Sequence, residues 1–253
     1  MVETQIKETN LIERLFSVGA HFGYSRSKRH PSVSPYIFGV RNRTELFDLE
    51  KTSRLLEEAS TAMESWGKER KIVLFVGGKS EARRAIETIA TRLGMPFVST
   101  RWIGGTLTNF PEIKQRLTRL STLREQRETV EFSKRYNKKE KLLIDREIDN
   151  LEKRFGGMMP MKNSLPDALV IVDTKHEYTA VREVFAKKIP FVGFGNSDCD
   201  MSAATYPIVG NDSSARTIEL VLGELASAYE RGLSSAPEKA QAQETNTKVP
   251  QQA

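Results

Sequence analysis

A chain of 253 residues with 38% hydrophobic residues can form one large domain with an appendage, and it contains no apolar run long enough to cross a membrane. The 39 Lys and Arg against 33 Asp and Glu give a net charge of +6, which favours a polyanionic partner but says nothing about the fold. The single cysteine, Cys199, excludes an internal disulfide and a cysteine-rich metal site. The first residues include acids and lack the apolar core of a signal peptide, so we expect a cytoplasmic protein.

The first part of the chain predicts two helices separated by a mostly irregular segment. A short helix is expected after Asn10, because asparagine favours helix N-caps. Residues 21–48 contain two prolines that disfavour helix, and short strands are expected at residues 36–40 and 45–49, on either side of the turn-like sequence RNRT. Apolar residues then recur on one face of a helix predicted over residues 50–69.

From residue 72 onward, apolar runs of strand length alternate with helical patterns. A strand at 72–76, a helix at 80–93 and a strand at 95–99 form a βαβ unit, which requires parallel strands. The alternation returns later, with strands expected at 167–173, 189–195 and 205–210 and helices at 176–188 and 214–232. Because the strands are almost unbroken apolar runs, we predict a mainly parallel sheet buried on both faces. The fold class is therefore α/β, three-layered and doubly wound, of the flavodoxin or Rossmann kind.

A highly charged segment, residues 111–155, separates the two halves of this pattern. Apolar residues step by three and four on both sides of its polar middle, as they do in a coiled coil. We therefore expect an antiparallel helical hairpin inserted into an α/β domain made of residues 1–110 and 156–232. Residues 233–253 are polar and rich in Ala, Gln, Thr and Pro, which predicts a disordered tail.

The sequence GGKS after the first apolar strand resembles the end of a phosphate-binding loop. A complete P-loop needs a glycine five residues before Gly78, where this chain has Val73. A later pair, Gly193 and Gly195, lacks the third glycine of a dinucleotide-binding fingerprint, because Asp198 stands at that position. Because both motifs are incomplete but present, a cytoplasmic nucleotide-binding α/β enzyme is the alternative interpretation of the sequence. The start of the helix after GGKS still suits an anion, including a phosphate of an RNA backbone.

The acids and histidines are arranged like helix starts rather than like catalytic or metal sites. Asp173 ends a predicted strand, and His176 and Glu177 follow it, which is typical of a cap and of an acid near a helix N-terminus. His21 would meet the acids around residue 200 at a metal only if the fold brought them together, and their spacing does not indicate this. We expect no catalytic residue, no cofactor and no metal.

Basic, aromatic and small polar residues gather in two segments that suit RNA. Residues 21–43 contain no acid, and their cations are interleaved with aromatic rings, so cations can contact phosphates while rings stack on bases. The sequence RWIGGTLTNF, residues 101–110, places an arginine beside a tryptophan and follows them with two glycines and short polar side chains. This second segment also fits a tight turn with Trp102 and Phe110 in the core and Asn109 as a helix cap, and the two interpretations are compatible.

A series of sequence stretches along residues 10–232 carries a family resemblance. In chain order they are GAHFGYSRSKRHPSVSPYIFGVRN, FDLEKT, IVLFVGGK, RWIGGTLTNF, LPDALVIVDTKHEYTAVREV, IPFVGFGNSD and GND. Together they resemble the bacterial small-subunit ribosomal protein S2 (S-two) family, and the charged hairpin occupies the position of that family's coiled coil. The resemblance implies a doubly wound parallel α/β sandwich with a helical hairpin and a non-enzymatic role.

The resemblance also implies partners and site residues. It implies a structural constituent of the small ribosomal subunit that binds small-subunit ribosomal RNA at the head–body junction. It further implies contacts with neighbouring small-subunit proteins, help in docking the mRNA-binding protein S1 (S-one) during translation, and no membrane. Carried onto this chain, it implies RNA contacts by Arg26, Lys28, Arg29, Arg41, Asn42, Arg43, Arg101, Trp102, Thr106, Thr108 and Asn109.

The chain departs from the usual residues of the resembled family at three positions. Tyr24 stands where the family usually has a histidine, Asn196 where it usually has a carboxylate, and Met201 where it usually has a proline. A metal or partner site that relatives build on these positions is therefore not carried over to this chain.

Overall fold

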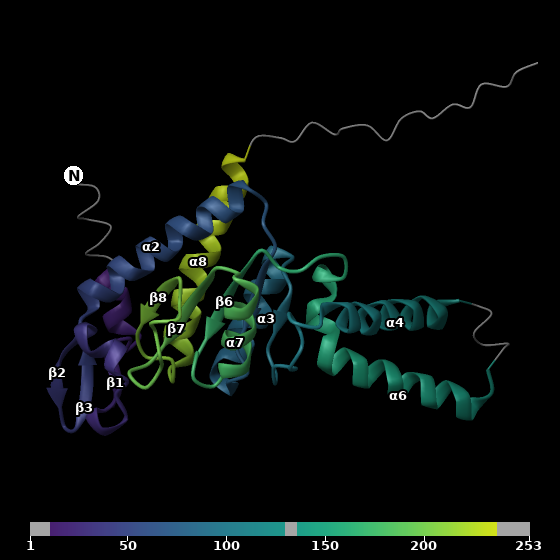
Figure 1. Cartoon of the computed structure of the whole chain (residues 1–253), viewed down its shortest axis with the longest axis horizontal. Coiled ribbons are helices and arrows are strands. Elements are labelled where there is room, and N and C mark those ends of the chain that lie inside the picture. The colour runs from purple at the N-terminus through teal and green to yellow at the C-terminus, as the bar shows by residue number, and fades with distance from the viewer. Residues whose placement is uncertain (1–10, 130–135, 237–253) are drawn as a thin grey trace, which may run out of the picture.

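The centre of the computed structural model, which describes residues 11–129 and 136–236, is a five-stranded parallel sheet (Figure 1). Its strands are β4 (Val73–Val76), β5 (Phe97–Val98), β6 (Ala168–Val172), β7 (Phe191–Gly195) and β8 (Tyr206–Val209). They lie in the order β5-β4-β6-β7-β8, and every neighbouring pair is parallel. The connections reverse direction between β4 and β6, so the carboxyl ends of these two strands form the topological switch point of the sheet.

Helices cover both faces of this sheet because successive strand residues point to opposite sides. Val73 and Phe75 of β4 pack in one cluster with three helices, α2 (Leu49–Lys68), α3 (Ser80–Leu93) and α8 (Ala215–Ser235). Leu74 and Val76 pack on the other side, with α7 (Tyr178–Lys187) and with the chain that enters and leaves the hairpin. The predicted three-layer, doubly wound α/β fold is confirmed.

Helices α2 and α8 cross where each carries a glycine. A Cβ atom on Gly67 would collide with the backbone carbonyl of Tyr229, and a Cβ atom on Gly232 would collide with that of Glu64. Only glycine lets the two backbones approach this closely. The crossing fixes the long C-terminal helix against α2, and α8 extends through Ser235, beyond its predicted end at residue 232.

A small antiparallel sheet lies at one end of the molecule, with its strands in the order β1-β3-β2 (Figure 1). These strands are β1 (Phe22–Ser25), β2 (Ile37–Arg41) and β3 (Thr44–Phe47). The second and third were predicted, whereas β1 was not. The expectation that prolines keep this region out of helix is also wrong in part, because η2 (Pro31–Tyr36) is a 3-10 helix. Pro31 occupies its first turn, where a backbone N–H has no helical partner to lose.

The charged insertion forms two helices that run antiparallel and project from the opposite end of the body (Figure 1). They are α4 (Phe110–Glu128) and α6 (Lys138–Phe155), followed by η3 (Gly156–Met161). Leu120, Leu123 and Ile148 form the buried seam between them. The middle of the predicted hairpin and the predicted tail lie largely outside the described residues, so the domain boundaries remain predictions. Within the described chain, none of the helices is both long and apolar enough to span a membrane.

Candidate nucleic-acid interface

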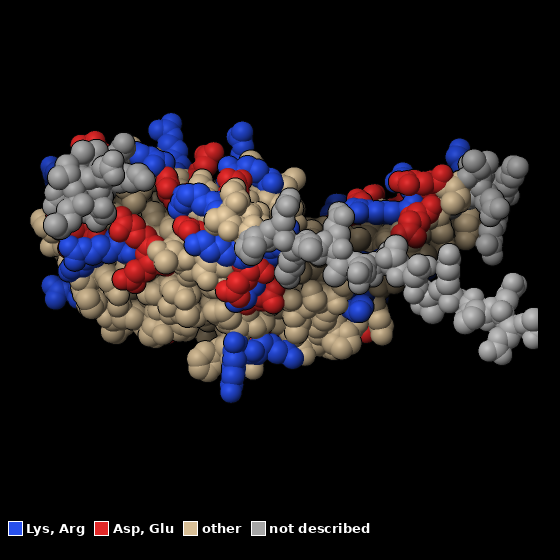
Figure 2. Space-filling model, turned by 90° about the horizontal axis from the view of Figure 1, so that it is seen from above, with Lys and Arg blue, Asp and Glu red and all other residues tan. Residues whose placement is uncertain are grey.

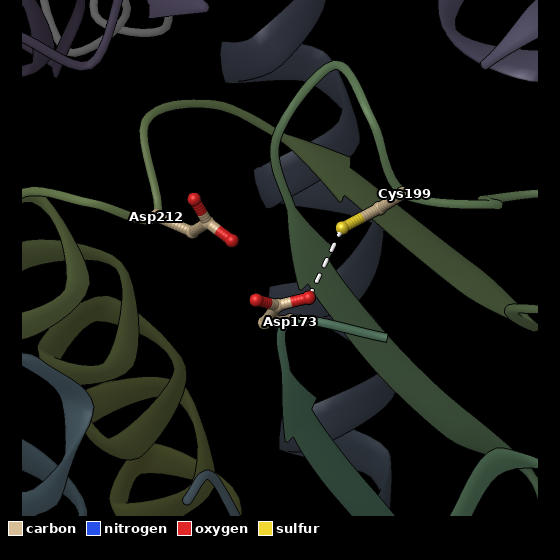
Figure 3. Close-up of side chains that lie close together, drawn as sticks. All are labelled: Asp173, Cys199 and Asp212. Atoms are coloured by element: carbon tan, nitrogen blue, oxygen red, sulfur yellow. Dashed lines mark hydrogen bonds between the residues drawn. The ribbon is translucent and has the colours of Figure 1, made fainter. Parts of the chain in front are cut away.

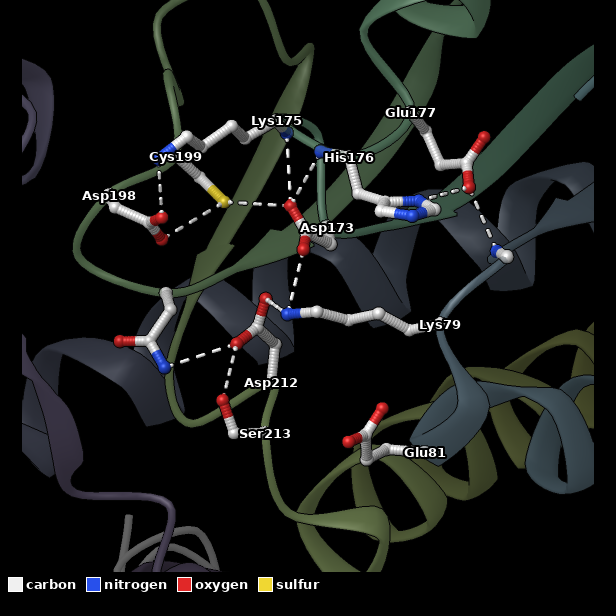
Figure 4. Close-up of polar contacts among 12 residues, drawn as sticks. Lys79, Glu81, Asp173, Lys175, His176, Glu177, Asp198, Cys199, Asp212 and Ser213 are labelled. Carbon is white, nitrogen blue, oxygen red and sulfur yellow. Dashed lines mark hydrogen bonds and ion pairs between the residues drawn. The ribbon is translucent and has the colours of Figure 1, made fainter. Parts of the chain in front are cut away.

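The switch point of the sheet, where open α/β folds bind nucleotides, is occupied by the chain's own side chains (Figure 4). Lys79 lies in the turn after β4 and extends toward the loops that follow β6 and β8. Its Nζ atom lies 2.7 Å from Asp173 Oδ2 and 2.8 Å from Asp212 Oδ2. The lysine that resembles a P-loop lysine therefore neutralises buried acids instead of facing a phosphate.

The backbone N–H just before α3 is also taken. Gly78 N–H donates to Glu177 Oε1 over 2.8 Å, and the same oxygen lies 2.9 Å from His176 Nδ1. Glu177 is buried, and a Cβ atom on Gly78 would meet this carboxylate and the carbonyl of Thr100. An internal carboxylate thus occupies the position in which an external anion would meet the start of α3.

The charges at the switch point are strongly coupled. Burial would lower the pKa of Lys79, but the contacts with Asp173 and Asp212 outweigh it and raise that pKa. Burial would raise the pKa of Asp173, but Lys79 and the backbone N–H of His176 lower it. Burial raises the pKa of the fully buried Asp212, and Lys79 offsets this only in part. Lys79 is therefore charged at neutral pH, with Asp173 as its main counter-charge.

Asp173, Cys199 and Asp212 converge on one point, as the donors of a metal site would (Figure 3). One ligand atom of each lies within 4.8 Å of the others. Burial and the neighbouring Asp173 raise the pKa of the Cys199 thiol to about 12, so beside Lys79 it keeps its proton at neutral pH. Lys79 already supplies the positive charge that these acids need, and we assign no metal to them.

His21, considered above for a metal site, lies in an aromatic stack rather than among acids. Its ring centroid is 4.6 Å from that of Phe16 and 4.0 Å from that of Phe22. Asp198 pairs with Lys175 over 2.8 Å. His21 therefore contacts aromatic rings, and Asp198 contacts a lysine, so the two do not form a metal site. Among the described residues, His21 Nδ1 has no hydrogen-bond partner.

The second predicted RNA segment, the 101–109 loop, is built around one buried carboxylate of α7. Glu183 Oε1 accepts from Trp102 Nε1 (3.0 Å) and from Gly105 N–H (2.7 Å). Glu183 Oε2 accepts from Leu107 N–H (2.9 Å) and from both the N–H and the hydroxyl of Thr108 (3.1 Å each). Burial would raise the pKa of Glu183, but these donors lower it. The backbone and side chains of the RWIGGTLTNF sequence therefore surround the ionised Glu183 carboxylate with N–H and O–H donors.

This arrangement sorts the predicted residues of the loop by accessibility. Trp102 and Thr106 are buried, so their side chains serve the fold rather than a solvent-facing surface. Arg101 and Asn109 are exposed on either side of them. Asn109 occupies the N-cap position of α4 but makes no side-chain capping hydrogen bond. Of the loop's long side chains, that of Arg101 is the one that faces solvent with a positive charge.

The first predicted segment divides in a similar way. Arg29 Nη1 lies 3.3 Å from Glu45 Oε1, and the fully buried Glu45 carboxylate has this ion pair but no hydrogen bond among the described residues. In contrast, Arg41, Asn42 and Arg43 are exposed at the turn between β2 and β3. Asn42 and Arg43 have φ angles of 51° and 65°, the combination that a type I′ hairpin turn requires.

The two predicted segments do not meet. The small sheet with η1 (Arg26–Lys28) lies at one end of the body, whereas the 101–109 loop leads into the hairpin at the other (Figure 1). An RNA that contacted both would have to extend along the body. This separation was not predicted, because nothing in the sequence relates the two segments in space.

Several cations elsewhere on the molecule are paired with neighbouring acids. On the face seen from above, Lys and Arg lie beside Asp and Glu over the body and along the hairpin (Figure 2). Ion pairs join Arg14 to Glu224, Lys68 to Glu64, Arg92 to Glu230, Arg119 to Glu147 and Arg127 to Asp145. Arg26, Arg41, Arg43 and Arg101 have no acidic ion-pair partner within the described ranges, which is also true of Arg54, Arg84 and Arg182. The first three are set apart by their place in residues 21–43, a segment that contains no acid, so their charges are available to an external anion.

The sequence comparisons identify the family. Residues 15–232 match the profile described as Ribosomal protein S2. The chain belongs to the ribosomal protein S2 family. It is 38% identical over 236 residues to the small ribosomal subunit protein uS2 of a Nitratiruptor species, an alignment that covers 93% of this chain and 88% of the relative. It is 40% identical over 221 residues to the uS2 protein of Petrotoga mobilis, covering 87% and 76% of the two chains.

Membership of the S2 family makes the chain a ribosomal protein and not an enzyme. The alternative interpretation, a nucleotide-binding enzyme, is therefore wrong. Lys79, Glu177 and Asp212 supply the physical reason, because they occupy the crevice in which such an enzyme would hold its nucleotide.

Two of the three departures expected from the family resemblance, Tyr24 and Asn196, lie beside the same acids, whereas Met201 packs in a separate apolar cluster. The Tyr24 hydroxyl lies 2.7 Å from that of Ser213, next to Asp212. Asn196 Nδ2 donates to Asp212 Oδ1 over 3.1 Å. An amide at position 196, in place of a carboxylate, removes one negative charge from a site that a single lysine must balance. This chain therefore satisfies its buried acids with its own ammonium and amide groups.

Proposed function

We propose that this protein is a structural constituent of the small ribosomal subunit that binds ribosomal RNA through the exposed cations of residues 26–43 and through Arg101. Relatives that match most of the chain are named small ribosomal subunit proteins. The observation that carries the proposal is the exposure of Arg26, Arg41 and Arg43, without an acidic partner among the described residues, in a segment that contains no acid; Arg101 is exposed and unpaired in the second segment. Such side chains contact phosphates without first breaking an internal ion pair.

The geometry of the small sheet supports an RNA contact at that end. The β2–β3 turn projects two arginines, Arg41 and Arg43, and Lys28 Nζ lies 5.4 Å from the centroid of the Tyr24 ring. Holding non-glycine residues at positive φ costs free energy, and such strain is often found where a side chain must be presented to a partner. We assign the phosphate contacts mainly to Arg26, Lys28, Arg41, Arg43 and Arg101.

The finer placement rests on the family resemblance. We infer binding at the head–body junction of the subunit and help in docking protein S1 during translation. Phe38 and Val40 of β2, with Phe16 and Phe22 nearby in the chain, are large exposed apolar side chains beside the proposed RNA contacts. They offer a neighbouring ribosomal protein, or S1, an apolar surface to pack against.

Charge reversal tests the RNA assignment. The double variant Arg43→Glu/Arg101→Glu should fold normally, because both side chains are exposed, and should fail to join small subunits on sucrose gradients. A matched control is Arg54→Glu/Arg84→Glu, which changes the net charge equally at exposed positions of α2 and α3. Incorporation of the first variant at the level of the control would refute the site, and absence of the parent from small subunits would refute the function.

A further inference from the structure

Helix α7 separates its charges between its two faces. Its two acids, Glu177 at the N-cap and Glu183, are buried and satisfy the chain's own N–H groups. Its solvent side carries Tyr178, which is 61% exposed, and Phe185, which is 73% exposed. Arg182 is exposed between them. The sequence of this helix looks mixed in charge, but the surface it presents is aromatic and basic.

The three exposed side chains form one stripe. Tyr178, Arg182 and Phe185 stand at i, i+4 and i+7, which places them on the same face of a helix. The Arg182 guanidinium lies 5.7 Å from the centroid of the Tyr178 ring, so the ring and the cation are presented together. Lys187 and Lys188, both exposed, extend the positive charge at the C-terminal end. No ion pair to an acid is found for Arg182, Lys187 or Lys188 among the described residues.

This stripe is tied to the loop already proposed to contact RNA. Glu183, on the buried side of α7, holds the N–H groups of Gly105, Leu107 and Thr108 within 3.1 Å. The exposed Arg101 belongs to the same loop, so the loop that carries this cation is anchored to the helix that carries the stripe.

We propose that the exposed face of α7 binds unpaired nucleotides of the ribosomal RNA, with bases stacked on Tyr178 and Phe185 and phosphates on Arg182 and the lysines that follow. Exposed rings flanked only by cations match the two chemical parts of a nucleotide, its planar base and its anion. A protein partner would need acids to match the same cations, whereas an RNA strand supplies both the anions and the planar bases. This inference rests on the proposed function and adds a surface that the sequence did not indicate.

Photocrosslinking in assembled subunits distinguishes the occupants. A benzophenone amino acid in place of Phe185 should crosslink to RNA in purified small subunits, giving a slowly migrating adduct that ribonuclease converts back to a species of nearly the size of the free protein. A crosslink only to another protein, or no crosslink at all in subunits that contain the variant, would overturn the proposal. Absence of the parent protein from the subunits would instead reject the proposed function itself.

Rebinding measurements test the chemistry of the contact. Tyr178→Ala and Phe185→Ala should each weaken rebinding to subunits depleted of this protein by about tenfold, whereas Tyr178→Phe and Phe185→Trp should retain affinity because they keep a ring. Arg182→Gln should reduce the slope of log affinity against log salt by about 0.7, the effect of one lost phosphate contact. Unchanged affinity in the alanine variants, with circular dichroism matching the parent, would contradict stacking.

Discussion

Two turns of this protein each follow a strand and each carry a cation, but their cations have opposite uses. The turn after β4 directs Lys79 inward, where it is 2.7 Å from Asp173 and 2.8 Å from Asp212. The β2–β3 turn directs Arg41 and Arg43 outward, with no acid beside them among the described residues. The first cation stabilises the fold, and the second pair is available to a polyanion.

The difference shows why net charge alone does not locate a binding surface. A lysine in a glycine turn after a parallel strand resembles a phosphate ligand by sequence, yet here the phosphate position is filled by buried carboxylates. The deciding property is whether the protein itself supplies the counter-charge. Removing the cation should therefore have opposite consequences in the two turns, with unfolding in one and loss of affinity in the other.

The largest effect is expected for Lys79→Met. This change leaves Asp173 and Asp212 buried without a counter-charge, and breaking a buried pair from one side costs about 3–5 kcal/mol. The free energy of unfolding, measured by urea denaturation at pH 7, should fall by that amount. The matched control is Lys175→Met, because Lys175 is exposed and its pair with Asp198 should contribute less than about 1 kcal/mol.

The pH dependence sharpens this test. In the parent the pKa of Asp173 is lowered, so its stabilising contribution is present at neutral pH and is lost as the pH falls through its folded pKa. In Lys79→Met the uncompensated acids should have raised pKa values, so protonation on going from pH 8 to pH 5 should restore part of the stability. Equal losses for Lys79→Met and Lys175→Met at all pH values would contradict the assigned role of Lys79.

A smaller effect is expected for Glu183→Gln, which tests how the 101–109 loop is held. In the parent the N–H and O–H donors of the loop are divided between the two carboxylate oxygens of Glu183, whereas a glutamine amide offers them only one oxygen. We therefore expect a loss of about 2 kcal/mol in unfolding free energy. The pKa of Glu183 is lowered in the fold, so the parent should lose this contribution as the pH falls below about 4.3. The variant should lack that part of the acid transition, and an unchanged pH profile would count against an ionised Glu183.

Periodicity and apolar runs were sufficient to predict the main architecture. The strand at Val73–Val76 and the helix at Ser80–Leu93 followed directly from the pattern, because an apolar run and a helical repeat are local signals, even though β4 pairs with the distant β6 and α3 packs against α8. Strand β1 was missed, since Phe22–Ser25 is short and pairs with residues about twenty positions later. The 3-10 helix at Pro31–Tyr36 was missed because proline was considered only as a breaker, whereas it is favourable in a first turn.

The candidate site could be predicted only in part. The acid-free segment before residue 43 and the cation Arg101 were visible in the sequence. The burial of Trp102 was one of the two interpretations of its loop, whereas the burial of Thr106 was not expected. The partner that accepts a hydrogen bond from Trp102 is Glu183, about eighty residues away. A signal was available, because Glu183 projects beside Ala180 and Val184 on the apolar face of its helix. An acid on an apolar face needs internal donors.

The smallest effect, and the one that most directly separates affinity from stability, is expected for Arg43→Gly. Arg43 has a φ of 65°, which costs a non-glycine residue about 1 kcal/mol, so glycine should preserve or slightly raise the unfolding free energy. The same change removes one phosphate contact, so affinity for depleted small subunits should fall and its salt dependence should weaken by about 0.7 in the log–log slope. Arg43→Lys keeps the charge and should keep most of the affinity. If Arg43→Gly bound like the parent at every salt concentration, Arg43 would contribute nothing to RNA binding. Lys79 and Arg43 could then no longer be contrasted as a structural cation and a binding cation.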